Sequence, residues 1–80
     1  MQRTRSGVKQ AKEFGRRVQR RRAEMKPFVS QEHLAELAGV HRTYIGHVER
    51  GEVNPTLWNV IRIAAALDVD PSDLVAGLSP

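Results

Sequence analysis

Polar and cationic side chains recur on one side of a short segment in the middle of the chain. Thr43, His47 and Arg50 follow one another at steps of three or four residues, and Arg42 lies just before them. At about 100° per residue, such steps place side chains on one face of an α-helix. A helix fits the major groove of duplex DNA, where hydroxyl, imidazole and guanidinium groups can bond to base edges and phosphates. The pattern therefore predicts nucleic-acid recognition.

A helix from about His41 to just before Gly51 would position this face. Ile45 and Val48 fall on the opposite side of that helix, so we expect them in the core. Gly46 falls on the polar face, where the lack of a side chain would allow close approach to a partner.

Another short helix is expected immediately before this one. Ser30 is a good N-cap, because its hydroxyl can accept a hydrogen bond from a free amide of the first turn. Gly39 can adopt the positive φ that ends a helix sharply. Between them lies an apolar stripe formed by Leu34, Leu37 and Ala38. Residues 30–51 are thus predicted to be two helices joined by a tight turn.

This segment resembles the helix-turn-helix of the Xre family, the Cro/repressor type. The matching residues are Ser30-Gln31-Glu32, Leu34-Ala35, Gly39-Val40, Tyr44-Ile45, Val48-Glu49-Arg50-Gly51, Asn54-Pro55-Thr56-Leu57, Val60-Ile61, Ala64 and Leu67-Asp68-Val69. The resemblance covers residues 10–78. It implies an all-α, compact five-helix domain of lambda-repressor-like fold, with the third helix in the major groove.

Roles for individual residues follow from the polar face and from this resemblance. Base edges would be read by Arg42, Thr43 and His47. The DNA backbone would be contacted by Gln31, Tyr44, Arg50 and Asn54. Gln31 opens a helix, whose free amides and positive dipole end attract phosphate. For Asn54, a hydrogen bond within its own loop is an equally good interpretation.

The first helix is expected over residues 9–25, with Phe14 and Val18 facing the core. Arg22 lies on the same apolar stripe, and an unpaired buried charge is very costly. Glu49, on the inward side of the third helix, is the expected partner, and the Xre family has the same pair. We therefore interpret Arg22 and Glu49 as a structural ion pair. The arginines off the stripe are expected to be solvated, namely Arg16, Arg17, Arg20 and Arg21.

The remaining apolar residues give expectations about the core and a possible interface. Phe28 should cap the core, and Trp58 should pack against it. A fourth helix over residues 57–67, with Thr56 as its N-cap, should have an inward face formed by Leu57, Val60, Ile61 and Ala64. A fifth helix should begin at Asp70, its N-cap. Val75 and Leu78 have little obvious cover, so they either form a dimer interface, pack locally or belong to a loose tail.

Composition limits the classes of function. The chain has 80 residues and a net charge of +4, which divides into +8 over residues 1–26 and −4 over residues 27–80. We expect residues 1–8 to be a flexible basic arm and residues 9–80 to be one domain. The charge asymmetry suggests a polyanion partner. Without cysteine or a catalytic constellation, the sequence predicts no metal, no cofactor, no membrane segment and no enzyme activity.

Two hypotheses about function remain. The first is a cytoplasmic, nucleoid-associated transcription regulator that binds double-stranded DNA as a homodimer on a palindromic operator. The run Arg42-Thr43-Tyr44-Ile45 and the short length look similar to controller proteins of restriction-modification systems, and phage or plasmid repressors fit equally. The second is an antitoxin-type interaction module that also regulates its own gene. A protein partner, a toxin or RNA polymerase, would then bind exposed Phe28, Trp58, Val75 and Leu78.

Overall fold

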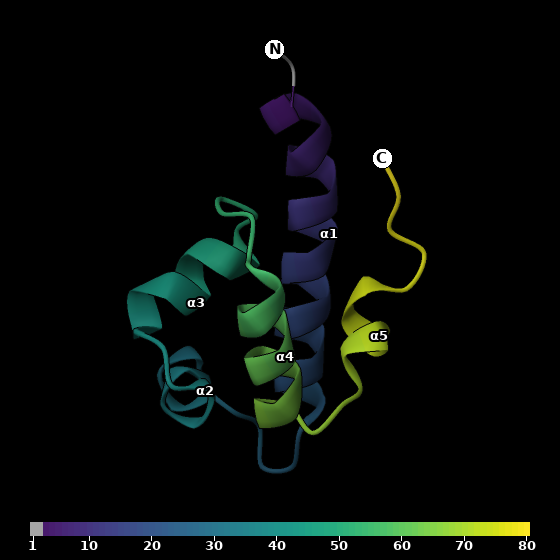
Figure 1. The fold of residues 1–80 in the computed structure, drawn as a ribbon. Coiled ribbons are helices and arrows are strands. Elements are labelled where there is room, and N and C mark those ends of the chain that lie inside the picture. Colours follow the sequence, from purple (N-terminus) through teal and green to yellow (C-terminus); the bar gives the residue numbers. More distant parts are fainter. Residues whose placement is uncertain (1–2) are drawn as a thin grey trace.

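The computed structural model describes residues 3–80, with side chains from Val8 onward. Over this range the chain forms five helices and no strand: α1 (Arg3–Glu24), α2 (Gln31–Ala38), α3 (Arg42–Glu49), α4 (Leu57–Ala66) and α5 (Pro71–Val75). In Figure 1, α2 and α3 lie on one side of α1 and α4, and α5 lies on the other. The predicted all-α, five-helix fold class is confirmed.

The first helix starts earlier than the sequence suggested. Its backbone is helical from Arg3 to Glu24, so residues 3–8 continue α1 rather than preceding it. Residues 1–2 of the expected arm lie outside the described part of the chain. The flexibility of the arm itself stays a prediction.

Three polar side chains cap α2, α4 and α5, as the sequence predicted. The hydroxyl of Ser30 accepts from the amide of His33 at 3.0 Å, and Thr56 Oγ1 accepts from the amide of Asn59 at 3.1 Å. Asp70 accepts from the amide of Ser72 at 2.9 Å, and this bond holds the pKa of the Asp70 carboxyl below its usual value. Each side chain thus satisfies an amide that the helix leaves free.

The core lies where α1 crosses the other helices. Its largest fully buried side chains are Leu34, Ile45, Ile63, Leu67, Leu74, Val18 and Val48. Phe14 of α1 joins the same cluster, as predicted. Burying residues from all five helices in one cluster is what allows an 80-residue chain to hold its helices in fixed positions.

The buried face of α4 differs from the predicted one. Ile63 and Leu67 are fully buried, whereas Leu57 is 75% exposed and Ile61 is also exposed. The expectation is confirmed for Ala64, which is buried, and for Val60, which packs against the core, but it was wrong for Leu57 and Ile61. The helix carries two overlapping apolar stripes at helical steps, and periodicity cannot choose between them. The stripe left outside also carries Trp58, which is 63% exposed rather than packed.

Two other apolar side chains were wrongly placed in the core. Leu37 is 52% exposed. The buried face of α2 is formed by Leu34, Ala35 and Ala38, and Leu37 projects from a different side of the helix. Phe28, expected to cap the core, is 67% exposed in the link between α1 and α2. Val29, its neighbour, fills the core position instead.

Close approach between α1 and the end of α3 fixes the orientation of α3. A Cβ added to Gly15 would lie 2.3 Å from the carbonyl oxygen of Val48 and 2.7 Å from that of Glu49. These are backbone atoms, which cannot yield as the end of a flexible side chain can. Gly15 therefore lets the backbone of α1 rest directly on the last turn of α3.

Candidate nucleic-acid interface

The turn between α2 and α3 is tied to α4. Gly39 adopts φ 74°, as predicted for the end of α2, and the amide of Val40 bonds to the carbonyl of Ala35 at 3.0 Å. Arg62 of α4 donates from Nε to the carbonyl of Ala38 at 2.9 Å and from Nη2 to the carbonyl of Gly39. Sequence reasoning missed Arg62, because a lone cation on a helix does not indicate which distant carbonyls it will meet.

The third helix presents the predicted polar residues outward. Arg42 and Thr43 at its start are exposed, and the side chain of His47 is 42% exposed. His41 is the N-cap, because its Nδ1 accepts from the amide of Thr43 at 3.0 Å. The only intramolecular partner of the Arg42 guanidinium among the described residues is Glu32, at a loose 3.7 Å. Arg42 and Thr43 are therefore free to contact a bound partner.

The inward side of α3 is held by an ion pair. Arg22 donates from Nε and Nη2 to the two carboxylate oxygens of Glu49 at 2.7 and 2.9 Å, and from Nη1 to the carbonyl of Val29 at 3.0 Å. The side chains of Arg22 and Glu49 are only 13% and 4% exposed. Gln31 adds a bond from its amide to Glu49 Oε1 at 2.8 Å. The pair thus links α1, α3 and the start of α2, and it holds Gln31 beside the N-terminus of α2.

An acidic residue that sequence reasoning did not single out lies against the outward face. Gly51 adopts φ 72°, and the amides of Gly51 and Glu52 bond to the carbonyls of Val48 and His47 at 3.0 and 2.9 Å. These two bonds form a Schellman motif, which turns the chain back toward the last turn of α3. Glu52 Oε1 then lies 2.7 Å from His47 Nδ1, and Oε2 lies 3.0 Å from Arg50 Nε.

The two contacts of Glu52 with His47 and Arg50 change the pKa values of charged groups at the C-terminal end of α3. The hydrogen bonds from Arg50 and from His47 lower the pKa of the Glu52 carboxyl, and Glu52 in turn raises the pKa of Arg50. Glu52 is therefore ionised at neutral pH. Its negative charge offsets the positive charge of Arg50 at this end of α3.

One part of the expected polar face is covered. Gly46 is buried, because the guanidinium of Arg50 folds back over it, and an added Cβ would lie 3.1 Å from Arg50 Nη1. The prediction that Gly46 forms an open surface is therefore wrong for this state of the molecule. Arg50 would have to move for a partner to approach the helix at that point.

The other two residues expected at the DNA backbone lie at the edge of α3 and in the following loop. The hydroxyl of Tyr44 accepts from the side-chain amide of Asn59 of α4 at 3.1 Å. Its donor hydrogen is left for another acceptor. Asn54 is exposed in the loop between α3 and α4.

Two arginines of α1 are docked rather than solvated as expected. Arg17 donates to the carbonyl of Ala76 at 2.8 Å, and Arg21 donates to the carbonyl of Leu67 at 2.9 Å. A positive side chain near a helix end satisfies carbonyls that the helix leaves unpaired. Part of the basic charge of α1 therefore serves to hold α4 and α5.

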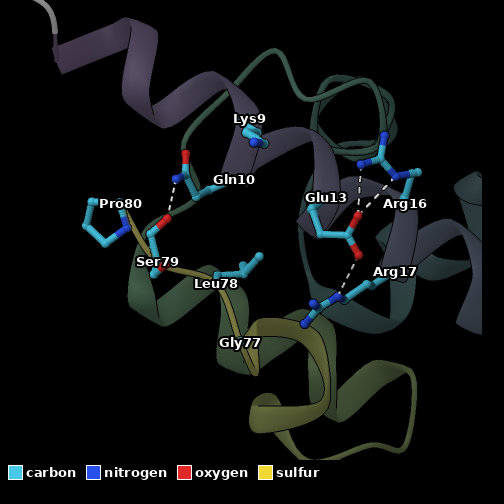
Figure 2. Close-up of a pocket in the computed structure, with 9 residues that line it drawn as sticks. All are labelled: Lys9, Gln10, Glu13, Arg16, Arg17, Gly77, Leu78, Ser79 and Pro80. Carbon is cyan, nitrogen blue, oxygen red and sulfur yellow. Dashed lines mark hydrogen bonds and ion pairs between the residues drawn. The ribbon is translucent and has the colours of Figure 1, made fainter.

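Figure 2 shows the hollow that this docking leaves between α1 and the C-terminal segment. Glu13 lies between Arg16 and Arg17, at 2.8 and 2.9 Å, and their hydrogen bonds lower the pKa of its carboxyl. Gln10 donates to the carbonyl of Ser79. Glu13 thus offsets one of the three cationic side chains that line the hollow, which are Lys9, Arg16 and Arg17.

The two residues expected at a dimer interface differ in exposure. Val75 is 39% exposed on α5. Leu78 is half-buried and packs against the protein's own core, so it offers less surface to a partner. The stripe of α4 formed by Leu57, Trp58 and Ile61, named here the α4 apolar stripe, exposes more apolar surface than Val75 and Leu78.

Within residues 3–80, no helix is both long enough and apolar enough to cross a membrane. In the same part of the chain, no three His, Asp or Glu side chains gather closely enough to hold a metal ion.

Comparison with known proteins identifies the family. The helix-turn-helix family model HTH_3 matches residues 29–74. These residues run from the link before α2 to the middle of α5, so the match includes the whole outward face described above. The chain therefore belongs to this helix-turn-helix family, a class of DNA-binding transcription regulators.

Several relatives of this chain are controller proteins of restriction-modification systems or are named control proteins. Control protein C.SmaI of Serratia marcescens is 53% identical over 47 residues, which cover 59% of this chain and 56% of that protein. Control protein C.BamHI of Bacillus amyloliquefaciens is 45% identical over 62 residues, 78% of this chain and 75% of that protein. The restriction-modification controller protein C.AhdI of Aeromonas hydrophila shares the fold with a TM-score of 0.75 and 42% identity, over 80% of this chain and 94% of that one.

A repressor whose crystal structure was determined in complex with operator DNA has the same fold. The P22 c2 repressor in complex with a synthetic operator matches with a TM-score of 0.71 and 31% identity, over 81% of this chain and 96% of that chain. The predicted lambda-repressor-like class of helix-turn-helix fold is thus confirmed.

Proposed function

We propose that this protein is a sequence-specific transcription regulator of the restriction-modification controller type, which acts on DNA in the cytoplasm. It would bind an operator with α3 in the major groove. The observation that carries the proposal is the outward face of α3, where Arg42, Thr43 and His47 project from a helix fixed by the Arg22–Glu49 pair. Relatives that are named control proteins support this role.

The outward face divides into base-reading and anchoring groups. Arg42 and Thr43 are exposed at the start of α3, where side chains reach base edges in helix-turn-helix complexes. Gln31 opens α2, whose free amides attract a phosphate. Tyr44, Arg50 and Asn54 would add contacts to the DNA backbone. Phosphate contacts set the register of the helix, and base contacts set specificity.

The first prediction concerns Arg42. Arg42→Ala is expected to weaken binding to the operator by about 1–3 kcal/mol and to relax base preference at one position, because a bidentate guanidinium pair selects guanine. Arg20→Ala on α1, which removes the same charge from another exposed site, is the matched control. Fluorescence anisotropy on operator and scrambled duplexes measures both effects. An equal loss for Arg42→Ala on the two duplexes would contradict the base-reading role.

We further propose that the protein binds as a homodimer through the α4 apolar stripe. Leu57 and Trp58 are 75% and 63% exposed, and exposed apolar side chains next to one another mark interaction surfaces. Aromatic residues are enriched in the centre of such interfaces. A two-fold dimer would match the two-fold symmetry of a palindromic operator.

The dimer interface can be tested by two matched variants. Leu57→Ser combined with Trp58→Ser is expected to raise the dimer dissociation constant at least tenfold, since about 1.4 kcal/mol of lost burial suffices. Val75→Ser, at the interface that the sequence suggested, is expected to change it by less than threefold. Sedimentation equilibrium over a range of concentrations measures both constants. The reverse ranking would move the interface to α5.

A further inference from the structure

His47 has two competing neighbours at its Nδ1 atom. Glu52 Oε1 lies 2.7 Å away and Arg50 Nη2 lies 3.5 Å away. A carboxylate only accepts hydrogen bonds and a guanidinium only donates them, so the two contacts require opposite states of Nδ1. The contact with Glu52 requires a hydrogen on Nδ1, whereas the contact with Arg50 requires a lone pair there.

The distances decide between these two states. A separation of 2.7 Å is typical of a charge-assisted hydrogen bond, whereas 3.5 Å is at the outer limit of any hydrogen bond. Arg50 also already donates to the other oxygen of Glu52, at 3.0 Å. Nδ1 of His47 therefore carries the hydrogen and donates it to Glu52.

The position of Glu52 is set by the backbone. The amide of Glu52 bonds to the carbonyl of His47 itself, at 2.9 Å, in the closure that ends α3. This bond brings residue 52 back beside residue 47, and the hydrogen bond from Arg50 Nε to Oε2 orients its carboxylate. A carboxylate held in this way can determine the tautomer of a neighbouring imidazole, because a bond at one ring nitrogen fixes the role of the other.

We propose that Glu52 holds neutral His47 in the Nδ1–H tautomer, so that Nε2 accepts a hydrogen bond from an exocyclic amino group in the major groove. The amino groups available there are N6 of adenine and N4 of cytosine. Nε2 has no hydrogen-bond partner among the described residues, and the side chain is 42% exposed. This inference rests on the proposed function.

The acceptor at Nε2 discriminates between bases. Guanine offers O6 and N7 and thymine offers O4, all of which are acceptors that an unprotonated Nε2 repels. Arg42, which only donates, has the opposite preference. His47 and Arg42 would therefore select different bases at different positions of one half-site, with Glu52 as the residue that positions His47.

The tautomer can be tested without DNA. Nitrogen-15 chemical shifts of the imidazole in the full chain, recorded above the pH at which His47 titrates in the same spectra, report which nitrogen carries the hydrogen. Wild type is expected to show Nδ1–H. Glu52→Ala is expected to move the hydrogen to Nε2, because Arg50 then remains as the hydrogen-bond partner of Nδ1 among the described residues and donates to it. An Nε2–H tautomer in wild type would overturn the proposal.

Glu36→Ala is the matched control for this measurement. It removes the same charge from an acid that also lies beside a histidine, with Glu36 Oε1 at 3.5 Å from His33 Nδ1. It should leave the signals of His47 unchanged. A shift of His47 as large as that in Glu52→Ala would show that net charge, rather than the contact, controls the tautomer, and would also overturn the proposal.

The base preference is tested by selecting binding sites from a random duplex pool. Wild type and Glu36→Ala are expected to favour adenine or cytosine over guanine by about fivefold at one position of each half-site, the lower end of the effect of a mismatched base pair. Glu52→Ala should lose or reverse that preference and keep the rest of the site. An unchanged preference in Glu52→Ala would overturn the role of Glu52. If wild type selects no sequence, the proposed function fails together with the base contact, and the nitrogen spectra show whether the tautomer is nevertheless held.

Discussion

Replacing Arg22 by methionine is expected to lower the free energy of unfolding by about 3–5 kcal/mol. The change leaves the carboxylate of Glu49 without its cation while the side chain is only 4% exposed. Gln31 still donates one hydrogen bond to Glu49, so we expect a value toward the lower end. Such a loss is a large part of the stability of a small domain. Urea denaturation followed by circular dichroism measures it.

A double-mutant cycle separates this ion pair from packing. Glu49→Leu alone leaves Arg22, whose longer side chain is 13% exposed and can reach water, so we expect a smaller loss. The combination of Arg22→Met with Glu49→Leu buries no charge and should be more stable than Arg22→Met alone. If the two losses simply add, the pair is not coupled, and α3 must be held by apolar contacts.

The parts of the fold that the sequence could predict are those governed by local chemistry. Ser30, Thr56 and Asp70 cap helices because their oxygen atoms lie within reach of amides two or three residues away. Gly39 ends α2 because it tolerates positive φ. The pairing of Arg22 with Glu49 is a contact between distant residues that could still be expected. A cation on an apolar stripe requires a partner, and the resemblance to the Xre family supplied Glu49.

The parts that could not be predicted depend on contacts between distant residues. Arg62 holds the turn of residues 38 and 39, and Arg21 docks onto Leu67, but nothing near these arginines in the sequence indicates those carbonyls. Glu52 escaped notice for another reason. The sequence places it in a loop, and only the closure at Gly51 brings its carboxylate to His47. The balance of charge on the outward face was therefore the least predictable feature of the candidate site.

Two leucines of α2 provide the sharpest test of the core as the structure defines it. The sequence placed Leu34 and Leu37 on one stripe, whereas the structure buries Leu34 completely and leaves Leu37 52% exposed. Leu34→Ala is expected to lower the free energy of unfolding by about 2–5 kcal/mol through lost burial and a residual cavity. Leu37→Ala should change it by no more than about 0.5 kcal/mol, as for other surface substitutions.

Both variants exchange the same residue types within one eight-residue helix, so any difference in helix propensity cancels between them. The difference in their unfolding free energies therefore reports burial alone. Thermal and urea unfolding, at protein concentrations where the variants have the same oligomeric state, measure that difference. Equal losses would mean that Leu37 is covered in solution, and α2 would then have to be rotated relative to α4 or joined there by a second molecule.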